Sequence, residues 1–577
     1  MMERWWLGPK SGSLKETLAI DLEIGDNRLC ADSAPGTYYI SQRRDEAVFV
    51  FGYLLPRLDR HLSIEPAHIF RYVKEKGESW VEDFKGIFTV IVVRGSAIDI
   101  YNDRFGLSTF FYGRSGDSLV AASSIELVKP FVDQSLDPVN IYQYMLLNYF
   151  IQGRTIYRDI RFAGGGSIIR YRGGDYEIGQ WFHLESFLDR RTTRLPKRKV
   201  FSGARDLWLR LLRQYSDAFD SMGISQTLTA GLDSRMILAG LRHLGRNPET
   251  FTFGLNDSMD VRTARHIAAQ LGLRHHHYYP EDDFFSSFAA IAPETVAKGN
   301  GLNSIYRSHR LDTYSRLRHH SRAVFFGFAG SEVIRGLFPD RLLLSQLVID
   351  LWLDPHLDLQ QRIDSFFQAA GLPIEDQHRQ GLADRIRSYE FLKRPDLYLF
   401  SVIIPLHFGQ DVRMLQSMDM VSLCPYWDLD YLEFLKTTGY FLKNERKQDY
   451  AQLGHFRRRK GPYFSSRLIA MLDPQAASLD LGKGYSPLDM SRSLMVSGMK
   501  FMVHKTLHGK EKKIPNFSYG QWYKDFLMDF FKQTDFSYLG VRDNSRWLEA
   551  IATTRAKDEY GFLTWTQLAN IEYTRRL

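Results

Sequence analysis

The feature that most constrains the fold is a regular alternation of short apolar strands and amphipathic helices between about residues 200 and 345. Strand-like segments rich in β-branched and aromatic residues occur at 224–228, 250–253, 275–279 and 322–326. Apolar residues at helical spacing occur at 202–221, 234–244, 261–271 and 308–320. This alternation predicts an α/β fold with a doubly wound parallel sheet, in which ligands bind at the carboxyl ends of the strands. From about residue 345 onward helical patterns dominate, so we expect a helical C-terminal part.

The first 190 residues follow a different pattern, because strand-like segments cluster together instead of alternating with helices. Strands are predicted at 46–55, 86–93, 97–102, 119–122, 167–171 and 176–181, and helices at 66–75 and 139–150. Clustered strands with a few helices predict a layered α+β domain. The polar, basic and proline-bearing stretch 189–200 is the best linker in the chain. We therefore expect domains at 1–190 and 200–577, the second with a nucleotide-binding core at about 200–345 and a helical remainder.

The composition excludes several classes of protein. Of the 577 residues, 44% are hydrophobic and 25% are charged, which suits a large core and excludes general disorder. Cys30 and Cys424 are the only cysteines, which excludes a disulfide scaffold and a multi-thiolate zinc cluster. A net charge of +8 suits a phosphate-bearing ligand, whereas no long basic tract indicates a nucleic-acid surface.

The sequence shows neither a membrane span nor a secretion signal. No stretch approaches the roughly 18 uninterrupted apolar residues of a spanning helix. The opening residues, Met-Met-Glu-Arg-Trp-Trp, lack the basic-then-apolar layout of a signal peptide. We expect a cytoplasmic protein without a membrane partner.

The loop at 229–235 (Thr-Ala-Gly-Leu-Asp-Ser-Arg) leaves a predicted strand and opens a predicted helix. Its backbone N–H groups, the hydroxyls of Thr229 and Ser234 and the helix dipole together form a cradle for an anion. A carboxylate in such a site, Asp233, indicates Mg²⁺, which prefers oxygen ligands shared between protein and nucleotide. The loop has no lysine, so it is not the triphosphate loop of GTPases. An ordinary glycine turn capped by Asp or Ser is the alternative, and this loop alone does not decide between them.

A second glycine-bearing loop, 327–336, follows the predicted strand 322–326 of the same domain. The carboxyl ends of parallel strands meet at one edge of the sheet, so the two loops are predicted to lie together. Glu332 would then face the metal of a bound nucleotide.

Both loops resemble those of the asparagine synthetase family. The first is similar to its pyrophosphatase loop, Ser-Gly-Gly-Leu-Asp-Ser, and the second to its later Gly-x-Gly-x-Asp-Glu loop. Segments similar to the synthetase domain of that family are Thr250-Phe251-Thr252-Phe253-Gly254, Ala264-Arg265, Leu271-Gly272 and Pro425-Tyr426-Trp427-Asp428. Segments similar to its glutaminase-type, glutamine amidotransferase-like domain are 83–88, 103–106 and 122–126.

The resemblance implies an enzyme that uses ATP and Mg²⁺ to adenylate a carboxylate, releasing pyrophosphate, before an amine displaces AMP. By matching motifs, the pyrophosphate would be held by Thr229, Ala230, Gly231, Leu232, Asp233 and Ser234, with Asp233 also binding the metal. The adenosine site would be lined by Thr227, Phe253, Phe326 and Gly327. The catalytic candidates are Glu332 and a lysine for the α-phosphate, Lys512 or Lys513. A solvated basic loop is the alternative for each lysine.

Departures from the family pattern affect the N-terminal half. The family begins its glutaminase domain with cysteine directly after the initiator methionine, whereas this sequence begins Met1-Met2-Glu3. The stretch Phe51-Gly52-Tyr53 stands where Asn-Gly-Glu would grip glutamine. We therefore expect that glutamine hydrolysis is lost and that ammonia or another amine is the acceptor.

Other departures affect the two loops. Ser331 replaces an aspartate, which removes a metal ligand, while Ala230 and Ala329 replace glycines. Phe328 stands where asparagine synthetases carry Glu and β-lactam-forming relatives carry Tyr, so it offers neither a base nor a phenol. This argues against a β-lactam-forming enzyme and leaves free aspartate in doubt as the substrate.

Two alternatives to an amide-forming ligase remain open. One is an intramolecular peptide cyclase of the lasso-peptide type, which differs only in the acceptor, and the other is an inactive nucleotide-binding scaffold. A small-molecule or peptide carboxylate is the expected partner, and a homodimer is compatible with the sequence.

A metal role for 275–277, three consecutive histidines, is disfavoured, because neighbours on a strand face opposite sides. A hairpin or corner is favoured at 164–166, and a solvated face at 456–460.

Overall fold

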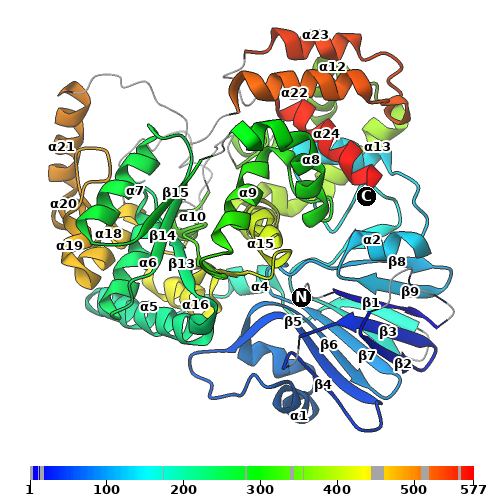
Figure 1. The fold of residues 1–577 in the computed structure, drawn as a ribbon, viewed down its shortest axis with the longest axis horizontal. Coiled ribbons are helices and arrows are strands. Elements are labelled where there is room, and N and C mark those ends of the chain that lie inside the picture. Colours follow the sequence, from blue (N-terminus) through cyan, green and yellow to red (C-terminus); the bar gives the residue numbers. More distant parts are fainter. Residues whose placement is uncertain are drawn as a thin grey trace.

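The computed structural model describes residues 4–10, 12, 14, 18–34, 36–172, 175–279, 282–337, 343–354, 356–442, 460–507, 519–555 and 561–577. It places the antiparallel N-terminal sheets below a parallel-sheet domain and a group of C-terminal helices (Figure 1). Within the described residues, no helix combines the length and the apolar character that crossing a membrane requires.

The N-terminal domain contains two six-stranded sheets in which every strand pairing is antiparallel. The first has the order β10(Ile160–Phe162), β8(Phe111–Ser115), β9(Ser118–Ala122), β1(Arg4–Pro9), β3(Asn27–Asp32) and β2(Ile20–Ile24). The second has the order β12(Asp175–Gln180), β11(Ser167–Arg172), β7(Ala97–Asn102), β6(Phe84–Arg94), β5(Glu46–Pro56) and β4(Tyr38–Ile40).

Four layers make up this domain. Alternating apolar residues of both sheets, among them Trp5, Leu29, Phe49 and Ile91, form one core between the sheets. The outer face of the second sheet is covered by α1(Pro66–Lys76), and the outer face of the first packs near α2(Ile125–Val128) and α3(Pro138–Leu147). The predicted layered α+β architecture is confirmed.

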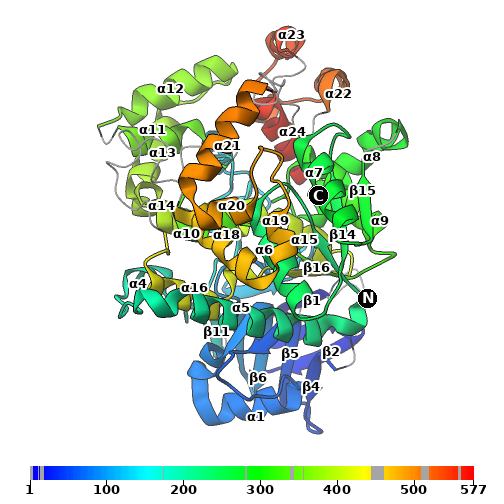
Figure 2. The same ribbon diagram turned by 90° about the vertical axis from the view of Figure 1, so that its left-hand side faces the viewer.

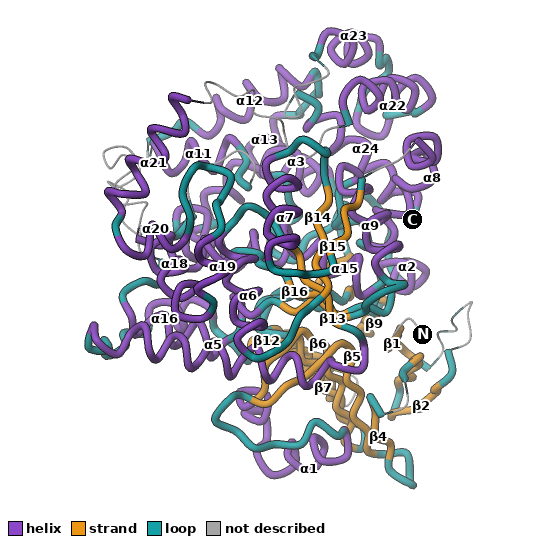
Figure 3. Tube along the Cα trace, turned by 60° about the vertical axis from the view of Figure 1, so that its left-hand side comes forward, coloured by secondary structure: helices purple, strands orange, loops and turns teal. Residues whose placement is uncertain are grey.

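The second domain contains a five-stranded sheet of the order β15(His275–Tyr278), β14(Glu249–Phe253), β13(Ile224–Thr227), β16(Ala323–Phe325) and β17(Val421–Leu423). All four pairings are parallel. Helices cover both faces: α6(Leu232–His243) and α7(Met259–Gln270) lie on one side, and α9(Ser308–Leu317) and α15(Gly409–Gln416) on the other (Figures 1 and 3). The predicted doubly wound parallel sheet is confirmed.

Two features of the second domain differ from the sequence-based expectation. The helical remainder contributes the edge strand β17 to the sheet, which its surrounding helical pattern concealed. The helix expected from residue 202 begins earlier, as α5(Lys197–Phe219), inside the predicted linker. Val200 is buried there, so the basic end of the linker belongs to an amphipathic helix.

The helix α5 lies at the boundary between the two domains (Figure 2). Gln214 on α5 donates from Nε2 to the carbonyl oxygen of Pro56 at 2.9 Å. Tyr53 on β5 packs edge-on against Phe219 of the same helix, with ring centroids 5.1 Å apart. The two domains are therefore joined by packed side chains as well as by the chain itself.

The remaining helices follow the parallel sheet or link it to the N-terminal domain. They are α4(Leu184–Asp189), α8(Asp282–Lys298), α10(Gly330–Arg335), α11(Gln346–Leu353), α12(Leu359–Ala370), α13(Asp376–Ser388), α14(Pro395–Tyr398), the π-helix Leu399–Phe408, α16(Leu429–Thr438), α18(Lys460–Leu472), α19(Pro474–Ser478), α20(Pro487–Arg492), α21(Leu494–Leu507), α22(Gly520–Gln533), α23(Ser545–Thr553) and α24(Leu563–Arg576). The last of them contacts α3 and α8, so it bridges the two domains.

Candidate functional site

The first loop is held in shape by its own hydroxyl groups. Ser234 Oγ accepts a hydrogen bond from the backbone N–H of Thr229 at 3.2 Å, and Thr229 Oγ1 accepts from that of Gly231 at 3.1 Å. These bonds join the end of β13 to the first turn of α6, a helix of 12 residues. The start of α6 therefore meets the carboxyl end of β13 at a compact turn, where helix N–H groups and the dipole favour an anion.

A residue that sequence reasoning missed supports this loop from the next helix. Asp260, in the first turn of α7, accepts a hydrogen bond from the backbone N–H of Ala230 at 3.0 Å. Because α7 follows β14, its first turn lies at the same sheet edge as the first loop. The signal that could have indicated Asp260 is an acidic residue directly before the predicted helix 261–271, which follows the second strand of the domain.

The two predicted loops meet. The backbone N–H of Ser331 donates to Asp233 Oδ2 at 3.0 Å, and the Ser331 hydroxyl contacts Asp233 Oδ1 at 3.0 Å and Oδ2 at 2.9 Å. Tyr426 donates its hydroxyl hydrogen to the backbone oxygen of Asp233 at 2.9 Å, a contact that no sequence pattern predicted.

Glycine permits this close approach. A Cβ at Gly327 would lie 2.8 Å from the backbone nitrogen of Ser234, and one at Gly330 would lie 2.8 Å from Asp233 Cγ. Side chains at either position would push the loops apart, so both glycines are required by the contact between the loops.

The carboxyl group of Asp233 is electrostatically unusual. Burial and the nearby negative charge of Glu332 raise the pKa of Asp233 to about 7, although the hydrogen bonds from Ser331 oppose the shift. Glu332 itself forms an ion pair with Arg335 at 3.0 Å. Two carboxyl groups thus lie close enough to repel each other at the start of α10.

This set of oxygen atoms fits a magnesium ion that arrives with phosphates. A cation would relieve the repulsion between Asp233 and Glu332, and Mg²⁺ is commonly held by one or two carboxylates together with substrate phosphates. Among the described residues, no group of three or more His, Cys, Asp or Glu side chains could hold a metal by itself.

The residues predicted to line the adenosine site are distributed along the same sheet edge. Phe253 at the end of β14 is partly exposed and lies beneath the guanidinium group of Arg310, 4.8 Å from its carbon. The Thr227 hydroxyl at the end of β13 points toward the Phe325 carbonyl oxygen at 3.4 Å. Phe326 is fully buried, and its backbone N–H donates to the Leu423 carbonyl oxygen at 3.0 Å. Thr227, Phe253 and Gly327 thus lie at the edge of the sheet that carries the loops, whereas Phe326 is buried in the core.

Phe328 begins a stack of aromatic rings beside the second loop. Its ring centroid lies 4.5 Å from Phe326, 5.1 Å from Phe408 and 6.3 Å from Trp427, and all three pairs are nearly parallel. The next residue, Ala329, has φ +55°, a left-handed conformation that disfavours residues other than glycine. The chain therefore tolerates local strain at the turn between Phe328 and the Asp233 contact.

The remaining predictions concern two lysines and three consecutive histidines. Lys512 and Lys513 fall outside the described residues. The three histidines diverge: His275 contacts Thr250, His276 pairs with Glu249, and His277 contacts the Gly254 carbonyl oxygen.

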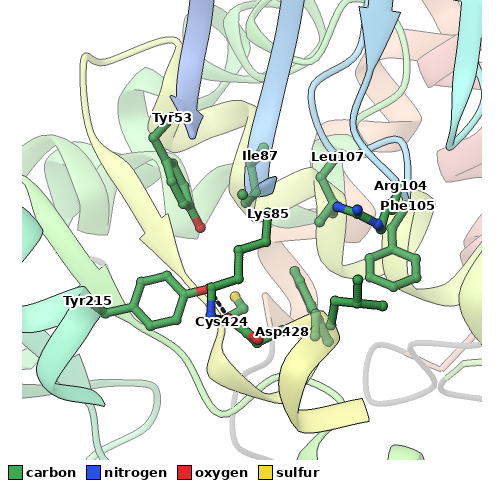
Figure 4. A pocket seen from close by; sticks show the side chains of 12 residues that line it. Tyr53, Lys85, Ile87, Arg104, Phe105, Leu107, Tyr215, Cys424 and Asp428 are labelled. Atoms are coloured by element: carbon green, nitrogen blue, oxygen red, sulfur yellow. Dashed lines mark hydrogen bonds and ion pairs between the residues drawn. The ribbon is translucent and has the colours of Figure 1, made fainter. Parts of the chain in front are cut away.

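A pocket lies between the two domains (Figure 4). Its lining comes from both domains: Tyr53, Lys85, Gly86, Ile87, Arg104, Phe105, Leu107, Tyr215, Cys424, Trp427, Asp428 and Leu429. Trp427 lines this pocket and also stacks near Phe328 of the second loop.

A buried ion-pair network crosses the domain boundary at this pocket. Lys85 Nζ on β6 lies 2.8 Å from the carboxylates of both Asp428 and Asp430, and all three side chains are almost fully buried. Burial alone would raise the pKa of Asp430, but the charges of Lys85 and Arg57 hold it below its ordinary value. Tyr215 donates a hydrogen bond to Asp428 at 3.0 Å. The ion pairs of Lys85 join residues more than 340 positions apart in the sequence and hold the segment that carries Tyr426 and Trp427 in place.

Cys30 and Tyr53 of the N-terminal domain are both engaged within the fold. Cys30 is buried in β3, and burial together with the charge of Asp21 raises the pKa of its thiol to about 11. The Tyr53 hydroxyl points across the domain boundary to the Ser422 carbonyl oxygen at 3.3 Å. A thiol with a raised pKa is a poor nucleophile at neutral pH.

Comparison with known proteins identifies two domains in this chain. Residues 67–182 match the glutamine amidotransferase domain, and residues 221–392 match the asparagine synthase domain. No match to a curated protein sequence was found.

Two solved structures are similar to parts of the chain. Glutamine phosphoribosylpyrophosphate amidotransferase from B. subtilis, complexed with ADP and GMP, is 10% identical with a TM-score of 0.20, over 48% of this chain and 59% of that one. A structure described as the allosteric regulatory enzyme of purine biosynthesis is 9% identical with a TM-score of 0.20, over 43% of this chain and 58% of that one. The chain thus spans less than two thirds of either. The chain thus carries a region that matches a glutamine amidotransferase domain followed by a region that matches an asparagine synthase domain, which is the domain architecture of the asparagine synthetase family.

Proposed function

We propose that this protein is an ATP-dependent ligase that adenylates a carboxylate and transfers the acyl group to an amine. The observation that carries the proposal is the contact between the two glycine-bearing loops, in which Ser331 donates to Asp233 at the carboxyl edge of the parallel sheet. The match to the asparagine synthase domain supports the same class of enzyme.

In the first proposed step, a carboxylate oxygen forms a bond to the α-phosphorus of ATP as the bond to pyrophosphate breaks. In the second, an amine nitrogen bonds to the acyl carbon and loses a proton, and AMP leaves. The N–H groups at the start of α6, with the hydroxyls of Thr229 and Ser234, would hold the departing pyrophosphate. Asp233 and Glu332 would hold Mg²⁺, which when bound neutralises phosphate charge.

Glutamine is not the source of the amine in this proposal. The raised pKa of the Cys30 thiol and the engagement of Tyr53 at the domain boundary support this view. Ammonia from solution, or an amine on a second substrate, would then be the acceptor, and the N-terminal domain would serve to brace the synthetase domain through Lys85.

A nucleotide-binding scaffold without turnover is the second candidate function. The observation that favours it is that both oxygens of Asp233 accept hydrogen bonds from Ser331, which compete with a metal ion for those oxygens. On this alternative ATP binds, but pyrophosphate is not released.

The test is to incubate the purified protein with ATP, Mg²⁺ and a panel of carboxylates, with hydroxylamine as a general amine. Pyrophosphate release that depends on the carboxylate, with formation of the matching hydroxamate, is the expected result. ATP binding without pyrophosphate would favour the scaffold, and neither binding nor release would refute both candidates. Replacing hydroxylamine by glutamine is expected to yield no glutamate and no amide, whereas ammonium salts should support the reaction.

A further inference from the structure

The second loop presents an aromatic surface beside the proposed adenylation site. The rings of Phe328 and Phe408 are partly exposed, and they are backed by Phe326 and Trp427, which are 0% and 4% exposed. Phe408 and Trp427 also contact each other, with centroids 6.1 Å apart. We call the exposed rings of Phe328 and Phe408, with Trp427 behind them, the aromatic wall.

The wall lies within one turn of the reacting groups of the proposed reaction. Phe328 is three residues before Ser331, which donates to both oxygens of Asp233. Gly327, the residue before Phe328, approaches the first turn of α6 so closely that a Cβ there would lie 2.8 Å from the Ser234 nitrogen. A carboxylate that reaches phosphate held by residues 229–234 would therefore carry its adjoining group past this wall.

His407, Arg307 and Asp411, which lie next to the wall, are engaged with one another or with neighbouring side chains. His407, adjacent to Phe408, accepts a hydrogen bond at Nε2 from Arg307 at 2.8 Å and shares one at Nδ1 with the Tyr149 hydroxyl at 2.8 Å. Burial keeps the pKa of His407 well below its ordinary value. Arg307 also forms an ion pair with the buried carboxylate of Asp411 at 2.6 Å. A second charge on the substrate, such as the ammonium or side-chain carboxylate of aspartate, would find no free counter-ion in this group.

Partly exposed aromatic rings favour a ligand with apolar surface. Such rings bury 150–250 Å² each and prefer stacked or edge-on partners. We propose that the carboxylate substrate carries an aromatic or branched aliphatic group next to its carboxyl group, which packs on the aromatic wall. This inference rests on the proposed ligase activity, because it concerns the substrate of the same site.

The experiment compares carboxylates that differ only in the adjoining group. Pyrophosphate release and hydroxamate formation would be measured with aspartate, glutamate, N-acetyl-phenylalanine and N-acetyl-leucine, and ATP binding would be measured separately by calorimetry. We expect kcat/KM for the two apolar substrates to exceed that for aspartate by about tenfold or more, the discrimination that apolar pockets commonly provide.

Variants test whether the wall causes the preference. Phe328→Glu places a carboxylate on the wall, and is expected to lower kcat/KM for the apolar substrates by about tenfold or more. Phe408→Leu keeps the wall apolar but removes a ring, and is expected to raise KM for N-acetyl-phenylalanine with little change in kcat. Phe366→Leu on α12, a helix outside both loops, is the matched control and should leave both parameters unchanged.

The outcomes separate the two proposals. Aspartate used as well as the apolar carboxylates would leave the ligase proposal intact and overturn this inference. An apolar preference that is unchanged in both Phe328→Glu and Phe408→Leu would also overturn it. Pyrophosphate release with none of the carboxylates would overturn both proposals.

Discussion

Replacing Asp233 by asparagine is predicted to stabilise the protein without ligands at pH 8 while abolishing adenylation. Burial and the charge of Glu332 raise the pKa of Asp233 from 3.8 to about 7. A carboxyl group with a raised pKa in the folded state reduces stability progressively as the pH rises from 3.8 through 7, because the folded protein then holds a proton more tightly than the unfolded chain. Asparagine has no charge to bury, and it can still accept from the Ser331 N–H and donate to its hydroxyl.

The size of this effect follows from the pKa difference. At 1.36 kcal/mol for each pKa unit, the interval from 3.8 to about 7 corresponds to at most about 4 kcal/mol. Asp233 is only half-buried, so solvent screens its charge and reduces this free-energy penalty. We therefore expect the substitution to stabilise the protein by about 1–2 kcal/mol at pH 8. At pH 5 most of the penalty is absent, so the variant and the wild type should differ little.

Thermal unfolding at pH 5 and pH 8 measures this difference. The thermal midpoint of Asp233→Asn should exceed that of the wild type at pH 8 and approach it at pH 5. Asp117→Asn, in the exposed turn between β8 and β9, is the control and should show no such pH dependence. A variant less stable than the wild type at pH 8 would show that the Asp233 charge is stabilised in the folded protein, and would refute the reasoning.

Three further substitutions test other parts of the structure. Lys85→Met leaves the buried carboxylate of Asp428 without an ion-pair partner, while Asp430 keeps Arg57, and should cost about 3–5 kcal/mol, seen as a lower thermal midpoint; an unchanged midpoint would contradict the role of the network. Ala329→Gly relieves a left-handed conformation and should stabilise the protein by about 1 kcal/mol in chemical denaturation, and destabilisation would argue against strain at this turn. Gly327→Ala places a Cβ 2.8 Å from the Ser234 nitrogen and should weaken ATP binding by about tenfold or more in calorimetry, unlike Gly381→Ala, where a Cβ meets nothing within 4 Å.

The sequence pattern predicted the parallel sheet because each strand and helix there has its own local periodicity. Residues 224–227, 249–253, 275–278 and 323–325 form four strands within a few residues of the predicted ones. β17 could not be predicted this way, since three residues, Val-Ser-Leu, carry no periodicity and become a strand only by pairing with β16. β1 was missed for a similar reason, because Gly8 and Pro9 interrupt its apolar run.

The candidate site was predictable in position but not in its contacts. Because both loops connect a strand to a helix at the carboxyl edge of the sheet, the sequence alone predicted that residues 229–234 and 327–332 lie together. The sequence indicated Ser331 only as a weak substitute for a metal-binding aspartate, whereas in the fold its hydroxyl binds Asp233 directly. The pairing of Lys85 with Asp430 joins residues 345 positions apart, so no local pattern could reveal it.

Hydrogen–deuterium exchange with and without ATP and Mg²⁺ tests the central claim most directly. If one nucleotide is bound between the two loops, peptides covering 228–236 and 326–336 should both become protected when ATP is added, while peptides from β2 and β3 should not change. Protection of only one loop, or of neither while ATP binds elsewhere, would contradict the account.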